Sequence, residues 1–159
     1  MNLIHLHLML NHLPVLGIPF GLGLLLYGVF KKSEELKKTA LGTLVIIAVL
    51  TIPAYLTGES AEQAVVSLPG VTQPFIEKHD DAAAIAFTAL LALGVTAFVG
   101  LVRFRGARAL PAWFTHLVLV TSVVVGGLMA WTANLGGQIR HTEIRPGFEL
   151  PAAKDAKDR

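Results

Sequence analysis

The sequence predicts an all-α integral membrane protein, an up-down four-helix bundle. Of the 159 residues, 53% are hydrophobic and only 15% are charged, whereas soluble domains average about 25% charged residues. The apolar residues form four blocks without charge, at residues 3–30, 39–57, 82–102 and 110–133. A membrane-spanning helix needs about 20 such residues, so each block predicts one span.

The first block, residues 3–30, is expected to stay in the mature protein. No basic leader precedes it, and it is longer than the core of a secretory signal. Gly17 and Gly21 form a GxxxG pattern that permits close helix packing. Gly126 and Gly127 lie in the middle of the fourth block, and all four glycines have two interpretations, simple packing or room for a flat macrocycle.

The loops alternate in charge. Lys31, Lys32, Lys37 and Lys38 fill the first loop, and the third loop has three arginines, Arg103, Arg105 and Arg108. The middle loop has five acidic residues and one lysine. Basic residues in short loops stay cytoplasmic, so the pattern predicts that the middle loop and both termini lie outside. The expected location is the inner membrane of a bacterium.

Within the middle loop, residues 60–66 could form a short helix before the Leu68-Pro69-Gly70 turn signal. Thr72 suits a helix cap and Pro74 a first turn, so the third helix is expected over about residues 74–103 and the fourth over about 110–135. The predicted domain covers residues 1–146. The polar, Pro-broken tail at 147–159 is expected to be mobile.

Five histidines, His5, His7, His12, His79 and His141, lie toward the outer ends of their helices. Counting about 1.5 Å per residue from the inner ends places His7 and His79 near ~35 Å, Glu59 near ~32 Å, and Glu62 and Asn134 near ~36 Å. His12 lies deeper, near ~27 Å. Each helix therefore contributes a polar group to one outer layer.

His12 is the first functional candidate, because an ionisable residue at membrane depth usually faces the bundle interior. His116 lies near the opposite end, beside Trp113. No ligand partner from another block is expected at its depth, which favours an interfacial residue.

Two kinds of cofactor fit the layer. Haem b is typically held by two imidazoles from different helices. His12 with His79 is the first choice, His7 is a level alternative, and His141 could fold over the mouth of the bundle. An unwound turn at Pro14 could absorb part of the depth difference of about 8 Å between His12 and His79.

Mixed His and carboxylate ligands instead suit a zinc, copper or iron ion. The candidate ligands are His12, His79, Glu59, Glu62 and His141, with Asn11, Asp80 and Asn134 orienting the imidazoles. The absence of cysteine excludes disulfides, covalently attached haem and Cys-ligated clusters. No catalytic constellation, phosphate loop or nucleic-acid signature is found.

Four stretches, HLHLMLNHLPVLG, TGESAE, EKHDDAA and TANLGGQIRH, together resemble a bacterial family of small four-helix membrane proteins catalogued as a domain of unknown function. The resemblance covers the chain to about Pro146. That family is similar to membrane cytochrome b bundles in helix count and in histidines on helices one and three. The resemblance implies His12 and His79 as the shared histidines and Glu59 as the acidic position. No inner histidine pair is present, so at most one haem per chain is implied.

The leading expectation is a membrane redox subunit that binds one b-type haem near the outer face. It would exchange electrons with a redox partner or a quinone in the lipid bilayer, and a homo-oligomer is left open. The first alternative is a non-haem metal-binding protein. The second is a cofactor-free structural subunit or a small-molecule transporter.

Overall fold

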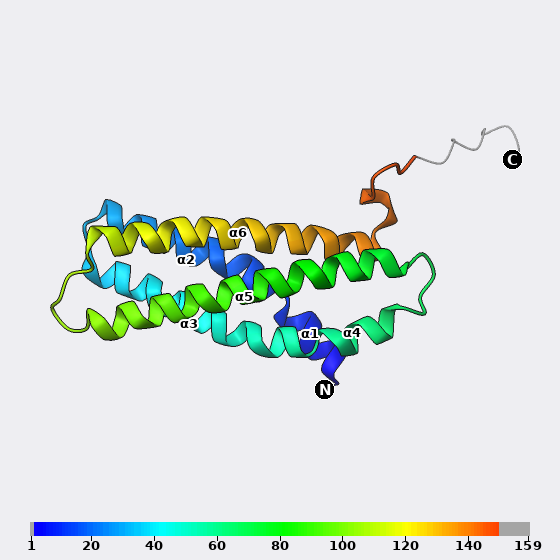
Figure 1. The fold of residues 1–159 in the computed structure, drawn as a ribbon, viewed down its shortest axis with the longest axis horizontal. Coiled ribbons are helices and arrows are strands. Elements are labelled where there is room, and N and C mark those ends of the chain that lie inside the picture. The colour runs from blue at the N-terminus through cyan, green and yellow to red at the C-terminus, as the bar shows by residue number, and fades with distance from the viewer. Residues whose placement is uncertain (1, 150–159) are drawn as a thin grey trace, which may run out of the picture.

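The computed structural model describes residues 2–149, and within them every regular element is a helix (Figure 1). The elements are α1 (Leu3–Leu10), α2 (His12–Phe30), α3 (Glu34–Leu56), α4 (Gly58–Val65), α5 (Gln73–Arg103), α6 (Ala112–Arg140) and the short 3-10 helix η1 (Thr142–Ile144). The stretches long and apolar enough to cross a membrane are Leu3–Phe30, Glu34–Leu56, Gln73–Arg103 and Ala112–Arg140. The predicted all-α four-helix class is confirmed.

The four long helices form a closed up-down bundle. Helix α2 packs against α3 and α6, and α5 packs against the same two helices, so α2 and α5 lie on a diagonal. One end carries the loops at residues 31–33 and 104–111 with their lysines and arginines, and is called the basic end. The other carries α4, the start of α5 and the end of α6, and is called the termini end (Figure 1).

The interior of the bundle is apolar. Ile18, Leu25, Leu44, Leu90 and Val118 are fully buried. Large apolar side chains also cover the outside, including Leu16, Phe20, Ile46, Val95 and Val120, each at least 60% exposed. Lipid tails are as apolar as these side chains, so a bilayer is the environment in which this perimeter is stable.

Gly17 and Gly21 bring α2 close to α3. A Cβ atom on either glycine would lie 2.8 Å from a side-chain carbon, of Ile47 for Gly17 and of Leu44 for Gly21. The packing interpretation of this GxxxG pattern is therefore confirmed. Gly127 differs, because nothing lies within 4 Å of the position that its Cβ would take.

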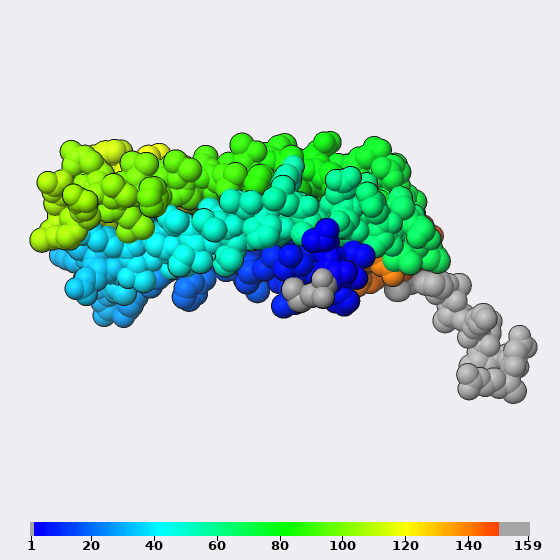
Figure 2. All heavy atoms as spheres, turned by 90° about the horizontal axis from the view of Figure 1, so that it is seen from below, coloured from blue at the N-terminus to red at the C-terminus, as the bar shows by residue number. Residues whose placement is uncertain are grey.

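The first span is broken at Asn11, whereas the apolar block predicted one continuous helix. Pro14 has no N–H for the carbonyl of Leu10, and its ring would clash with that carbonyl in a regular helix. The last N–H of α1 is that of Asn11, which bonds the His7 carbonyl at 2.9 Å. Helix α1 does not continue the direction of α2, and it packs on α3 and α4 (Figure 2).

Two helices begin as the loop signals suggested, with one difference. A short helix, α4, occupies the middle loop, and α5 has Thr72 at its N-cap with proline in the first turn. The side chain of Thr72 makes no capping hydrogen bond, however. Helix α3 begins at Glu34, before its charge-free block, because the Ser33 hydroxyl caps it by accepting from the Leu36 N–H at 3.3 Å.

Arg145 fastens the segment that follows α6. Its guanidinium donates to the carbonyls of Gln138 at 2.7 Å, Ile139 at 3.0 Å and Gly70 at 2.8 Å. It also lies 4.3 Å from the centre of the Phe75 ring. Carbonyls in the last turn of a helix lack partners within it, so Arg145 satisfies two of them while joining α6 to the middle loop. Most of the predicted tail, residues 150–159, lies outside the described residues.

Candidate functional site

The ring of His7 is oriented by the last turn of α3. Its Nδ1 lies 2.9 Å from the carbonyl oxygen of Ala54. That oxygen lies in the last turn of α3, where carbonyls lack N–H partners within the helix, and it also accepts from the Thr57 hydroxyl at 3.1 Å. Because a carbonyl can only accept, Nδ1 must carry the hydrogen. Nε2 of the neutral ring then keeps its lone pair.

The ring of His79, which is partly buried, is oriented in the same way by α6. Its Nδ1 lies 3.0 Å from the carbonyl oxygen of Thr132. Gly136, one turn further along α6, leaves room for this approach. A Cβ on Gly136 would lie 3.0 Å from Cε1 and 3.1 Å from Nδ1 of His79. The Nε2 atom of His79 is therefore also the atom with the available lone pair.

The two anchored imidazoles lie at the same end of the bundle. His7 is near enough to His79 for the two rings to interact electrostatically. They come from α1 and α5, the first and third spans. Histidines that bind metals almost always donate their second ring N–H to a carbonyl, carboxylate or water, and both rings already do so. The pair is called the histidine pair below.

The other histidines at the termini end are exposed. His12 begins α2, and its ring has no hydrogen-bond partner within residues 2–149. The Nδ1 of His141 lies 2.7 Å from Oε1 of Glu143. The Nδ1 of His5 lies 2.9 Å from Oδ1 of Asn2, the cap of α1. These contacts are local, so none of the three rings is fixed by a neighbouring helix.

A group of carboxylates lies beside the histidine pair. Burial, together with the nearby carboxylate of Asp80, raises the pKa of Glu62, and Glu59 and Glu77 contribute in the same direction. Glu62 on α4 therefore lies close to Asp80, the residue after His79. In the described part of the chain, however, no three His, Cys, Asp or Glu residues gather in a group that could hold a metal ion.

The two asparagines predicted to orient the imidazoles of His7 and His79 make no hydrogen bond to them in the described residues. Oδ1 of Asn11 is buried without a hydrogen-bond partner among the described residues. Oδ1 of Asn134 accepts from Nε2 of Gln138 at 2.7 Å. The groups that orient His7 and His79 are backbone carbonyls, which a residue pattern cannot reveal. Gly136, in the TANLGGQIRH stretch, is the one sequence signal that could have pointed to them.

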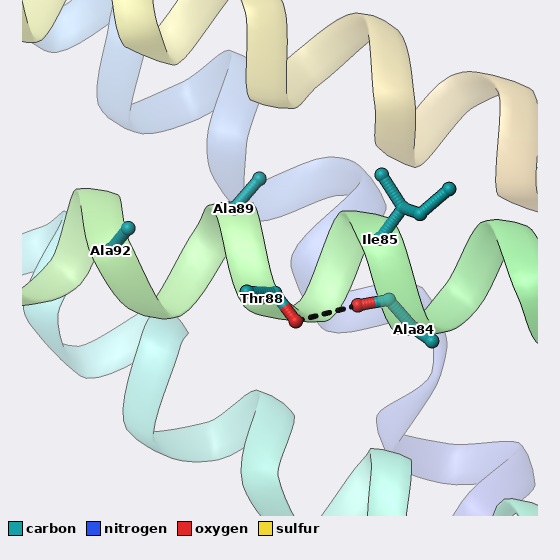
Figure 3. A pocket seen from close by; sticks show the side chains of 5 residues that line it. All are labelled: Ala84, Ile85, Thr88, Ala89 and Ala92. Carbon is teal, nitrogen blue, oxygen red and sulfur yellow. Dashed lines mark hydrogen bonds between the residues drawn. The ribbon is translucent and has the colours of Figure 1, made fainter.

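A separate shallow groove of about 490 Å³ runs along α5, lined by Ala84, Ile85, Thr88, Ala89 and Ala92 (Figure 3). The one hydroxyl in this lining, on Thr88, donates to the Ala84 carbonyl at 2.8 Å. The lining offers no metal ligand and no unsatisfied polar side chain. The groove therefore adds no chemistry to the site.

The comparison with protein families decides the membership of this chain. The model of a family described as "Predicted membrane protein (DUF2231)" matches residues 3–143. The chain belongs to this family. The resemblance inferred from the four stretches is thereby confirmed, and as a DUF2231 member the chain is a membrane protein. The match includes every span and the histidine pair. No curated protein and no solved structure matches the chain.

Proposed function

We propose that this DUF2231 protein is a membrane redox subunit that binds one b-type haem, which His7 and His79 would hold. The observation that supports this is the histidine pair itself. Two neutral imidazoles from different helices each donate Nδ1–H to a carbonyl and keep Nε2 available. This is the form of histidine that coordinates a metal.

The donor set favours haem over a bare metal ion. A zinc site takes roughly three or four protein ligands, and no group of three potential ligands gathers in residues 2–149. Haem needs only axial ligands from the protein, because the porphyrin supplies the rest. His7 replaces His12 as the partner of His79 in this proposal, since the His12 ring is exposed and unanchored.

Bound haem would supply one-electron transfer, and the chain would hold and tune it. The carbonyls of Ala54 and Thr132 fix both rings and make the imidazoles more basic. With the basic end in the cytoplasm, the haem would lie near the periplasmic side of a bacterial inner membrane. Its electrons would pass to or from a periplasmic partner or a quinone.

The visible spectrum of the purified protein tests the proposal. We expect a Soret band that shifts on reduction and is lost in His7→Ala and in His79→Ala. His12→Ala and His116→Ala should keep it, since neither ring belongs to the histidine pair. A colourless protein with stoichiometric metal would support the metal-binding alternative, and a protein with neither cofactor would overturn both.

Gly136→Ala tests the orienting carbonyl without touching a ligand. The added methyl group would push the His79 ring from its place, because its Cβ would lie 3.0 Å from Cε1. We expect haem affinity to fall by about tenfold, the size of effect seen when ligand-orienting contacts are removed. Gly127→Ala on the same helix is the control, since its Cβ would meet open space. Equal affinities in both variants would show that Gly136 has no such role.

A further inference from the structure

A cavity of about 210 Å³ lies at the basic end, at the opposite end of the bundle from the histidine pair. It is formed where the end of α2 meets the starts of α3 and α6. Three basic side chains line it, those of Lys32, Lys37 and His116. Glu34, Ala112 and Val29 also line it. The cavity therefore combines cationic groups with an apolar part.

Charge in this cavity is not balanced. Both oxygens of Glu34 are engaged, since Oε1 pairs with Lys37 and Oε2 accepts from the Leu110 N–H at 2.7 Å. Lys32 and His116 have no acidic partner in the described part of the chain. Glu34 thus neutralises Lys37 and leaves Lys32 as a lone cation, beside an imidazole that can also donate.

The backbone around the cavity offers donors and few acceptors. The N-cap of α6 is Pro111, which makes no side-chain capping bond, and Ala112 of the first turn lines the cavity. The N–H groups of a first helical turn lack partners in the helix and attract anions. At the end of α2, the carbonyls of Gly28 and Val29 are already taken by the N–H groups of Ser33 and Lys32.

Lys32 occupies a position where glycine is usual. The bonds from Ser33 to Gly28 at 2.9 Å and from Lys32 to Val29 at 3.1 Å make the common helix-ending motif whose left-handed residue is normally glycine. Lys32 holds φ at 52° there, which side chains rarely adopt. The side chain of Lys32 thus lines the cavity although the backbone of Lys32 is in an unfavourable conformation.

The depth of the cavity matches the headgroup region of a bilayer. Trp113, next to Ala112, is 65% exposed, and Tyr27 and Phe30 at the end of α2 are 51% and 77% exposed. Aromatic side chains of this kind gather at the membrane interface. We propose that the cavity binds the phosphate group of an anionic phospholipid, held by Lys32, His116 and the first turn of α6.

Lipid titration of the detergent-solubilised full chain tests this, with thermal stability as the readout. We expect phosphatidylglycerol to stabilise the protein more than phosphatidylcholine does. Lys32→Gly should weaken the apparent affinity for phosphatidylglycerol at least about fivefold, the effect of one lysine at an anionic membrane. The same variant should be at least as stable as the wild type without lipid, because glycine accepts the φ of 52°.

Lys31→Gly is the matched control. Lys31 has the same charge at the same end, but it lies over the rings of Tyr27 and Phe30 and not in the cavity lining. Its loss should weaken the affinity clearly less than the loss of Lys32 does, because Lys31 does not line the cavity. Equal losses in both variants would overturn the site in favour of general charge attraction.

Inorganic phosphate, used as a second probe, shows whether the cavity binds a soluble phosphate or the phosphate group of a lipid. Stabilisation by inorganic phosphate that depends on Lys32, without an effect of phosphatidylglycerol, would keep the anion site and assign it to a soluble phosphate. A Lys32-dependent effect of phosphatidylglycerol alone would assign it to lipid. No Lys32-dependent response to either probe would overturn the proposal.

Discussion

His7 and His79 obtain their orientation from carbonyl oxygens of neighbouring helices, Ala54 in α3 and Thr132 in α6. A carbonyl acceptor selects one tautomer and holds the ring without adding a titratable group. The carboxylates nearby have a different effect. They are gathered on α4 and the start of α5, where Glu62 and Asp80 lie close together, and they make stability depend on pH.

Glu62 and Glu143 should affect that dependence with opposite signs. Burial and Asp80 raise the pKa of Glu62 above its ordinary 4.5, so the folded protein prefers the protonated form and loses stability as pH rises above 4.5. The Glu143 N–H and the His141 ring lower the pKa of Glu143, so its contribution is present above 4.5 and is lost as pH falls through the lowered pKa.

We therefore expect Glu62→Gln to raise the melting temperature at neutral pH and Glu143→Gln to lower it. Both effects should be small, because Glu143 is exposed to solvent and Glu62 is only partly buried. Melting curves between about pH 4 and pH 8 measure them. The expectation fails if the two variants shift the melting temperature in the same direction.

At the scale of elements, the break between α1 and α2 decides which histidine reaches the bundle. Beyond Asn11 the chain changes direction, and α1 packs on α3 and α4. That tilt brings His7 to Ala54, while His12, at the start of α2, stays exposed. Pro14 is therefore expected to affect the position of the His7 ring, which lies two turns away along the chain.

Pro14→Ala tests this coupling. The new N–H could bond the Leu10 carbonyl and continue the helix, which would draw His7 away from Ala54. We expect about a tenfold loss of haem affinity, because an orienting contact is removed. Pro19→Ala is the control, since Pro19 lies inside the uninterrupted α2. Unchanged affinity in Pro14→Ala would show that the break does not position His7.

The spans were predictable because about 20 apolar residues without charge have few other uses. The count of helical rise also placed His7 and His79 at one level, and in the structure both rings lie at the termini end, each bonded to a backbone carbonyl. The preference for His12 rested on its depth in the membrane and on the family resemblance, and neither reveals which way its ring points. Which face a residue presents depends on the direction of α1, which is set by its packing against α3 and α4 after the break that Pro14 causes.

At the scale of the whole molecule, the two ends of the bundle differ in charge. Lysines and arginines fill the loops of the basic end, and acidic residues dominate α4 and the start of α5. This asymmetry predicts the orientation in the membrane. The chain contains no cysteine, so single cysteines can report on each end separately.

Gln63→Cys and Ala107→Cys place one exposed thiol at the termini end and one at the basic end. In cells with an intact inner membrane, an impermeant maleimide should label the cysteine at 63 and reach the one at 107 only after permeabilisation. This follows from the cytoplasmic preference of basic loops. The reverse labelling pattern would invert the proposed topology and place the histidine pair on the cytoplasmic side.

The hydrogen bonds of the histidine pair span most of the chain. His7 meets an acceptor 47 residues later, and His79 meets one 53 residues later. During biosynthesis the first ring gains its acceptor with the second span, before the third span exists. The second ring gains Thr132 only when α6 has been made. A nascent chain that stops before Thr132 has one oriented imidazole, so the proposed binding of haem by two oriented rings would follow insertion of the last helix.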